Sequence, residues 1–214
     1  MEFEHRLLNG LQMISSLLMS QSRVASSEAA AQLVIAAGRI SAFERVHRGL
    51  HLLDHREHVE FRQYLRQLCE DLSSLLFQSK AGRTIVVKCG EIALPATFAI
   101  PLSFIVNELI TNSAKYSDGN IAVQLEALSI VNYSLSVSDD GPGFPAGFDP
   151  ESGEGLGMKI VLSLVKQIGG EFHIAPGRAG ACFRITFRVP SDWPSQPISK
   201  PMRSSVLALI HQKA

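Results

Sequence analysis

The chain has 214 residues, of which 46% are hydrophobic and 19% are charged, which is enough for one or two domains with hydrophobic cores. Its 20 Lys and Arg residues balance its 20 Asp and Glu residues, which argues against the basic surface of a nucleic-acid-binding protein. Its three isolated cysteines make no disulfide framework or zinc motif, and the sequence shows neither a signal peptide nor an apolar run that could span a membrane. We therefore expect a cytoplasmic protein without a nucleic-acid partner.

Two helices joined by a polar turn are expected at the start of the chain, over residues 3–21 and 28–53. Apolar residues recur every three or four positions in both segments, which indicates one apolar seam on each helix. The first seam consists of Leu7, Leu11, Ile14 and Leu18. Because a two-helix hairpin buries such seams poorly by itself, we expect a homodimer through residues 1–58 that forms a four-helix bundle.

The polar side of the first helix carries His5 and Asn9, so we expect His5 to face solvent. Four further histidines near the end of the second helix are candidate metal ligands, namely His47, His51, His55 and His58. The spacing of the first three is compatible with a metal site, but no cysteine lies nearby and the acidic residues are scattered. A polar helix surface followed by a linker is therefore the preferred interpretation.

The rest of the chain mixes helices and strands. Helices are expected over residues 60–79, around 107–117 and over 155–169, and strands over 84–89, 120–128, 133–138, 171–175 and 182–189. This mixture predicts an α+β fold, in which a helical hairpin precedes an α/β sandwich with helices on one face of a mixed sheet. After Pro190, the proline- and serine-rich sequence predicts a poorly structured tail.

The segment NELITNSAKYS, residues 107–117, places an acid, an amide and a cation near one side of its helix. Glu108 and Asn112 are four residues apart, and Lys115 follows about one turn later. Side chains of these three kinds can together hold a metal-bound phosphate. The alternative is an ordinary amphipathic helix with a solvated polar side.

Two glycine-rich segments follow this helix. Asp139 ends a predicted strand and precedes Gly141 and Gly143, so its carboxylate can accept a hydrogen bond from an adenine amine while the backbone approaches the ligand. A plain turn is the alternative, because Asp, Gly and Pro all favour turns. A polar loop, residues 144–154, is expected to be a mobile lid, and the sequence GEGLG at 153–157 then exposes backbone amides to phosphate at a helix start.

In this order, the segments resemble the ATP-binding fold shared by gyrase, Hsp90, histidine kinases and MutL. Residues 107–116 resemble its N box, residues 139–143 its G1 box and residues 153–157 its G2 box. Upstream, EHRLLNGLQ at residues 4–12 resembles the H box of sensor histidine kinases of the His-Arg subfamily, which is close to the HWE kinases. The resemblance covers residues 2–190 and implies ATP and Mg²⁺ as cofactors.

The resemblance implies that His5 is the phosphoacceptor and that Glu4, Arg6, Asn9 and Glu108 belong to the catalytic set. Many histidine kinases carry an acid directly after the phosphoacceptor, and this chain has Arg6 there instead. The base that takes the imidazole proton is therefore open between Glu4 and Glu108. The Trp-x-Glu motif of the HWE kinases is absent from the sequence.

On the nucleotide side, the resemblance implies that Asn112 coordinates Mg²⁺, that Lys115 contacts phosphate and that Tyr116 packs at the adenine side. Asp139 would accept the adenine amine. The other positions implied to border the nucleotide are Asn107, Gly141, Gly143, Gly155, Leu156 and Gly157. Ala181 stands where the family carries a small hydroxyl residue, which slightly weakens one contact to adenine.

These implications favour a two-component histidine kinase that autophosphorylates His5 with ATP and passes the phosphate to an aspartate in the receiver domain of a response regulator. Its signal would come from a removed sensor domain or from a separate sensor protein. The expected division is residues 1–58 for dimerisation and phosphotransfer, 59–190 for ATP binding and 191–214 as a tail. The alternatives are a histidine phosphotransferase with a vestigial ATP domain and an anti-sigma-factor kinase domain, although the latter class lacks the helical hairpin.

Overall fold

The computed structural model describes residues 2–27, 29–30, 32–33, 36–38, 40–41, 44, 58–77, 82–145, 147–150, 156–175 and 180–191. For residues 2–7, His58 and Leu75 it describes the backbone without the side chains. The predicted tail from residue 192 onward and the candidate metal ligands His47, His51 and His55 lie outside the described residues. In the part of the chain that is described, no helix is long and apolar enough to cross a membrane.

The chain begins with α1 (Glu2–Ser22), and the described residues between 27 and 44 are helical as well. The two helical segments meet at Ser15, whose hydroxyl lies 3.0 Å from that of Ser41 and 3.3 Å from the carbonyl oxygen of Ala37. Ala37 is only 2% exposed. The prediction of a helical N-terminal region is therefore confirmed, while the dimeric four-helix bundle stays a prediction.

The face of α1 that packs in this hairpin differs from the predicted seam by one position. Leu11 is half-buried as expected, but Ile14 is 46% exposed and Ser15 takes its place in the contact. Met13 and Leu17 lie beside Ile14 on the helix and are 63% and 57% exposed. Within the described residues, α1 thus keeps a second apolar face that is open to solvent.

A five-stranded mixed sheet forms the second part of the fold, with the strand order β2-β4-β5-β7-β6. The parallel pair is β2 (Ile85–Cys89) with β4 (Ile121–Ala127), and every other neighbouring pair is antiparallel. The remaining strands are β5 (Asn132–Asp139), β6 (Glu171–Ile174) and β7 (Cys182–Arg188). All five agree with the strands predicted from the sequence.

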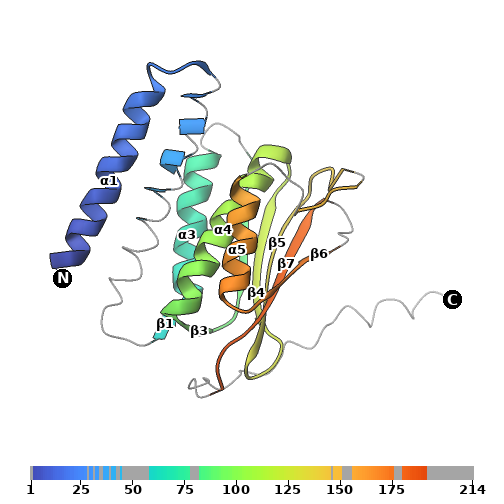
Figure 1. Ribbon diagram of the computed structural model, residues 1–214. Helices are drawn as coiled ribbons and strands as arrows, with labels where there is room; N and C mark the ends of the chain where they lie inside the picture. The colour runs from blue at the N-terminus through green and yellow to red at the C-terminus, as the bar shows by residue number, and fades with distance from the viewer. Residues whose placement is uncertain are drawn as a thin grey trace.

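Three helices lie side by side on one face of this sheet, as Figure 1 shows: α3 (Phe61–Leu76), α4 (Ala96–Tyr116) and α5 (Leu156–Gln167). One apolar stripe of α3 packs into the core, with Phe61 and Leu65 at 0% exposure. Because the helices cover one face, buried and more exposed residues alternate along β4. The predicted α+β fold with helices on one face of a mixed sheet is confirmed.

A second, two-stranded sheet was not expected from the sequence. In it, β1 (His58–Glu60) pairs antiparallel with β3 (Ala93–Pro95), so a strand lies at the end of the linker that was predicted after the second helix. Strands of three residues are too short to show the period of two that identifies a strand. Directly after β1, the amide of Phe61 donates a 2.9 Å hydrogen bond to the carbonyl of Ile92, which fixes the start of α3 beside β3.

α4 is the central helix, packed between α3 and α5 and against the sheet. Its apolar residues are buried, with Ile105 and Leu109 at 0% exposure. However, Asn107 and Glu108, which were expected to belong to the nucleotide and catalytic site, are also buried, at 6% and 7% exposure. The first two residues of α4 and its last turns, around Lys115, leave the packed interior.

Replacing Leu109 with Ala should lower the free energy of unfolding by about 3 kcal/mol, because it leaves a cavity against the sheet. The matched control is Leu128→Ala in the turn after β4, where the side chain is 58% exposed and the expected change is below about 0.5 kcal/mol. Urea unfolding followed by circular dichroism measures both changes. Equal effects of the two substitutions would contradict the central packing of α4.

Candidate functional site

A cavity of about 740 Å³ lies where the end of α4, the end of β5 and the start of α5 meet. α4 contributes Asn112, Ser113 and Lys115 to its lining, and β5 contributes its last residue, Asp139. The loop after β5, the first turn of α5 and the residues around the start of β7 close the other sides. The cavity therefore brings together residues that are far apart in the sequence, and it joins the three glycine- and asparagine-containing segments identified above.

The carboxylate of Asp139 is the most strongly held group of this cavity. Its Oδ2 accepts a 2.9 Å hydrogen bond from the hydroxyl of Ser113, and its Oδ1 accepts from the amides of Gly141 at 2.9 Å and Ala181 at 3.4 Å. Asp139 is 6% exposed, and a buried carboxylate is stable only when such donors replace water. Three segments of the chain thus converge on one side chain.

Ser113 was not among the residues predicted for the site. It is 4% exposed and lies on α4 directly after Asn112, so its only sequence signal was a small polar residue within an otherwise recognisable box. Its hydroxyl supplies the only side-chain donor to Asp139 among the described hydrogen bonds. Sequence periodicity could not reveal this contact, because the two residues are on different elements and 26 positions apart.

Gly141 and Gly180 lack side chains because the backbone passes too close to its neighbours. A Cβ atom at Gly141 would lie 2.5 Å from the Cβ of Ser117 and 2.8 Å from the Oδ1 of Asp139. Gly180 has a φ of +84°, and a Cβ there would overlap the backbone carbonyl of Asp139. Gly141 was predicted as a site residue, whereas Gly180 was missed because it belongs to the loop before β7 rather than to a recognised box.

The predicted N-box residues divide into two groups. Asn112, which is half-buried, and the exposed residues Lys115 and Tyr116 line the cavity, and the ammonium of Lys115 lies 4.9 Å from the ring centre of Tyr116. Asn107 and Glu108 lie about one turn earlier on α4, are buried, and are not among the residues that line the cavity. The structure therefore brings three of these five residues to the site.

The loop after β5 was expected to be polar, but it starts with an aromatic wall. Gly143, with a φ of +80°, leads into Phe144, which stacks on Phe148 with ring centres 4.8 Å apart. Phe144 also meets Phe183 of β7 edge to face at 4.9 Å. These rings line the cavity, so its wall beside Asp139 is apolar and suits a flat, hydrophobic ring.

At the start of α5, Leu156 is 60% exposed, Gly157 is buried, and both line the cavity. The first backbone amides of a helix have no partner within the helix and attract anions. This end of the cavity is therefore suited to phosphate. Gly155, which was predicted to contribute as well, lies outside the described residues.

The predicted H-box residues lie on the first turns of α1. Glu4, His5 and Arg6 have a described helical backbone, but their side chains lie outside the described part of the structure. Asn9 is exposed, in agreement with its expected place on the polar side of α1. The hairpin also reaches the cavity at Gln32, which is one of its lining residues.

Neither a built-in metal cage nor a cysteine nucleophile is found among the described residues. They contain no group of three or more His, Cys, Asp or Glu side chains that could hold a metal ion. Cys182, which pairs with Ser138 next to Asp139, is half-buried, and burial together with the nearby Asp139 carboxylate raises the pKa of its thiol. A thiol with a raised pKa stays protonated at neutral pH and is a poor nucleophile.

Replacing Ser113 with Ala should lower the free energy of unfolding by about 2 kcal/mol, because a buried carboxylate loses a charge-assisted donor. Ser103→Ala is the matched control on the same helix: Ser103 is equally buried, but its hydroxyl donates only to the Ala99 carbonyl of its own helix, at 2.6 Å. That substitution should change stability by less than about 1 kcal/mol. Chemical denaturation distinguishes the two, and a larger loss for the control would refute the assigned role of Ser113.

Two family models match the chain. The model described as histidine kinase matches residues 2–76, and the model described as histidine kinase-, DNA gyrase B- and HSP90-like ATPase matches residues 98–191. Sensor histidine kinase PdtaS of Mycobacterium tuberculosis is 26% identical over 199 residues, which is 88% of this chain and 38% of that protein. Blue-light-activated histidine kinase 2 of Erythrobacter litoralis is 22% identical over 193 residues, or 86% of this chain and 55% of that protein.

Solved structures show the same fold. The histidine kinase domain of the Erythrobacter litoralis EL346 blue-light-activated kinase matches with a TM-score of 0.64 at 20% identity, covering 87% of this chain and 92% of that one. Full-length ShkA in complex with AMPPNP matches with a TM-score of 0.52 at 20% identity, covering 87% of this chain and 44% of that one. The chain thus carries a histidine kinase domain, followed by an ATPase domain of the family shared by histidine kinases, DNA gyrase B and HSP90.

Proposed function

We propose that this chain is the catalytic core of a two-component histidine kinase, which autophosphorylates His5 with ATP and passes the phosphoryl group to an aspartate of a response regulator. The observation that carries this proposal is the cavity in which Asn112, Lys115, Asp139 and Gly157 converge. In chain order, these four residues come after α1, the helix that carries His5. The matched ATPase domain supports ATP as the nucleotide.

The adenine ring would bind at the end of the cavity formed by Asp139 and the aromatic wall. Two amides already occupy Oδ1 of Asp139, and the Ser113 hydroxyl occupies one acceptor position on Oδ2. One position on Oδ2 is then left for a donor such as the 6-amino group of adenine. Guanine carries a carbonyl oxygen at that position, which would face the carboxylate without a proton, so the geometry favours adenine.

The phosphates would lie at the opposite end, between the last turns of α4 and the start of α5. Lys115 supplies a positive charge there, and the α5 amides near Gly157 supply hydrogen-bond donors. Mg²⁺ commonly binds through one or two protein oxygens and the phosphates of the substrate, and the half-buried amide of Asn112 fits such a ligand. When bound, the ion would neutralise the charge that develops on the phosphates.

In the proposed reaction, a neutral imidazole nitrogen of His5 forms a bond to the γ-phosphorus. The bond from that phosphorus to the oxygen bridging to the β-phosphate breaks, and ADP leaves with the electron pair. The imidazole proton passes to a base, for which Glu4 and Glu108 are the candidates. Glu108 is 7% exposed and outside the cavity lining, which favours Glu4. In the second step, the aspartate carboxylate of the receiver domain takes the phosphoryl group from His5.

We propose the same division as above, with residues 1–58 for dimerisation and phosphotransfer, 59–190 for ATP binding and 191–214 as a tail. The open apolar face of α1 supports dimerisation, because large exposed apolar patches mark interaction sites. Gln12 and Ser16 are exposed on the polar side of α1 that also carries His5, and this side is where a response regulator would dock. The signal would reach the kinase from a sensor domain or a separate sensor protein.

The kinase proposal predicts that the chain incorporates label from γ-³²P-ATP in the presence of Mg²⁺ and that His5→Gln abolishes this labelling. The label should be stable to alkali and lost in acid, as expected for phosphohistidine. Asp139→Asn should reduce labelling by at least roughly tenfold, since one acceptor for adenine becomes an amide. If the His5→Gln variant retained the label, His5 would not be the phosphoacceptor.

The histidine phosphotransferase alternative gives a different outcome. Such a protein would bind no nucleotide in a fluorescence titration with a labelled ADP, yet it would accept phosphate at His5 from a phosphorylated receiver domain. The intact cavity and the held carboxylate of Asp139 favour the kinase over this alternative.

The proposed dimer predicts that Leu17→Glu shifts the chain from dimer to monomer, because it places a charge in the apolar face of α1. Ser16→Glu is the matched control, since it adds the same charge to the neighbouring polar side. Sedimentation equilibrium at micromolar concentrations measures both. A monomeric wild-type chain, or an unchanged Leu17→Glu dimer, would contradict dimerisation through this face.

A further inference from the structure

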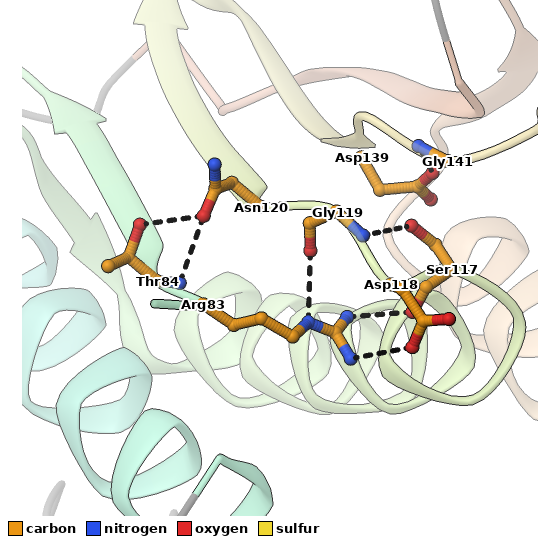
Figure 2. A network of polar contacts seen from close by, with 8 residues as sticks. All are labelled: Arg83, Thr84, Ser117, Asp118, Gly119, Asn120, Asp139 and Gly141. Atoms are coloured by element: carbon orange, nitrogen blue, oxygen red, sulfur yellow. Dashed lines mark hydrogen bonds and ion pairs between the residues drawn. The ribbon is translucent and has the colours of Figure 1, made fainter. Parts of the chain in front are cut away.

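Arg83 is a buried arginine in the turn before β2, outside both segments that the family models match. Its side chain is 7% exposed. The guanidinium donates two hydrogen bonds to backbone carbonyls of the loop that follows α4: Nε to Gly119 at 3.1 Å and Nη2 to Ser117 at 2.8 Å. Figure 2 shows this guanidinium directly below the loop.

Backbone carbonyls, rather than a carboxylate, hold this buried charge. Asp118 approaches Nη1 only to 3.8 Å and is 95% exposed, so its contribution is weak, and Nη1 has no hydrogen-bond partner among the described residues. The guanidinium also stacks over the ring of Phe77, 4.4 Å from its centre. A cation at the C-terminal end of a helix is favourable, because the last carbonyls there are unpaired and carry the negative end of the helix dipole.

The loop that Arg83 holds is packed against the segment that carries Asp139. The amide of Asp140 donates a 3.1 Å hydrogen bond to the carbonyl of Asn120. The side chain of Ser117 lies against Gly141. A Cβ atom added to Gly141 would come within 2.5 Å of the Cβ of Ser117 and within 2.8 Å of Oδ1 of Asp139. A shift of the loop toward this segment would therefore displace the backbone whose amide binds Asp139 (Figure 2).

We infer that Arg83 is a positioning residue for the nucleotide: by clamping the loop after α4, it holds Ser117 under Gly141 and so keeps the Asp139 carboxylate in place for adenine. This inference rests on the proposed function, because it assumes that the cavity binds ATP. Arg83 itself does not line the cavity, so it acts through the loop and not through a contact with the ligand.

A second set of hydrogen bonds holds the other end of the same loop, so an effect of Arg83 on nucleotide affinity can be separated from an effect on folding. The backbone amide and the hydroxyl of Thr84 both donate to the side-chain oxygen of Asn120, at 3.1 and 3.2 Å, and the amide of Ile121 donates to the Thr84 carbonyl at 3.0 Å. These bonds keep the end of the loop attached to β2 when Arg83 is replaced. A conservative variant of Arg83 should therefore keep the fold while the Ser117 end of the loop shifts.

The test is the affinity of the full chain for ADP with Mg²⁺, measured by calorimetry for the wild type and Arg83→Lys. Lysine keeps the charge but lacks the planar fork that reaches both carbonyls. We expect roughly tenfold weaker binding, the size of one lost charge-assisted hydrogen bond. Arg62→Lys, which changes an arginine paired with Glu91 on the surface, is the matched control and should bind as the wild type does.

A double-mutant cycle with Ser117→Ala separates positioning from a merely structural effect. If Arg83 acts through Ser117, the loss of affinity caused by Arg83→Lys should shrink at least about threefold in the Ser117→Ala background. A lower melting temperature with unchanged ADP affinity, or fully additive losses, would overturn the inference. If Arg83→Lys does not fold, Arg83→Gln, whose amide can still donate two hydrogen bonds, replaces it in the same cycle.

The ADP affinity of the wild-type chain distinguishes a failure of this inference from a failure of the proposed function. A wild-type chain that binds no ADP refutes nucleotide binding and the inference with it. A wild-type chain that binds ADP, together with an Arg83→Lys variant of equal affinity, refutes the role of Arg83 alone.

Discussion

The burial of the Asp139 carboxylate is the constraint on which the rest of the site depends. A charged group at 6% exposure is tolerated only when fixed donors replace its water, and here the donors come from α4, from the loop after β5 and from the residue before β7. To satisfy them, three segments must approach the same pair of oxygens. The end of α4 and the start of β7 are thereby both held beside the end of β5, where the cavity lies.

This convergence also explains which residues surround the carboxylate. The segments approach so closely that Gly141 and Gly180 leave no room for a Cβ, and Ser113 contributes a hydroxyl short enough to fit between helix and strand. The loop after α4 is drawn into the same packing, since Ser117 lies against Gly141. The guanidinium of Arg83 stabilises this loop through its hydrogen bonds to the Gly119 and Ser117 carbonyls. The positions of the helix end, the loop and the Asp139 carboxylate therefore depend on one another.

The sequence predicts the elements that carry a strong local period and misses what depends on contacts between distant segments. The stripe of α3 and the five strands of the main sheet follow from their apolar periods, and Asp139 and Gly141 follow from a recognisable box. The three-residue strands β1 and β3, the hydroxyl of Ser113 and the loop glycine Gly180 have no local signal, because each is defined by a partner elsewhere in the chain. Asn107 was expected to border the nucleotide, and its burial likewise follows from packing between elements, since α4 lies between α3 and α5.

The position of Glu108 bears on what the cavity can do with ATP. A carboxylate that activates water for hydrolysis must reach the water beside the γ-phosphate, within hydrogen-bond distance. Glu108 is buried and outside the lining, and the carboxylates that do line the cavity among the described residues are Asp139, which is already bound by three donors, and Asp149 of the loop after β5. Among the described residues, Glu108 is therefore not placed to activate a water molecule inside the cavity, and the oxygens of Asp139 are already engaged by its three donors.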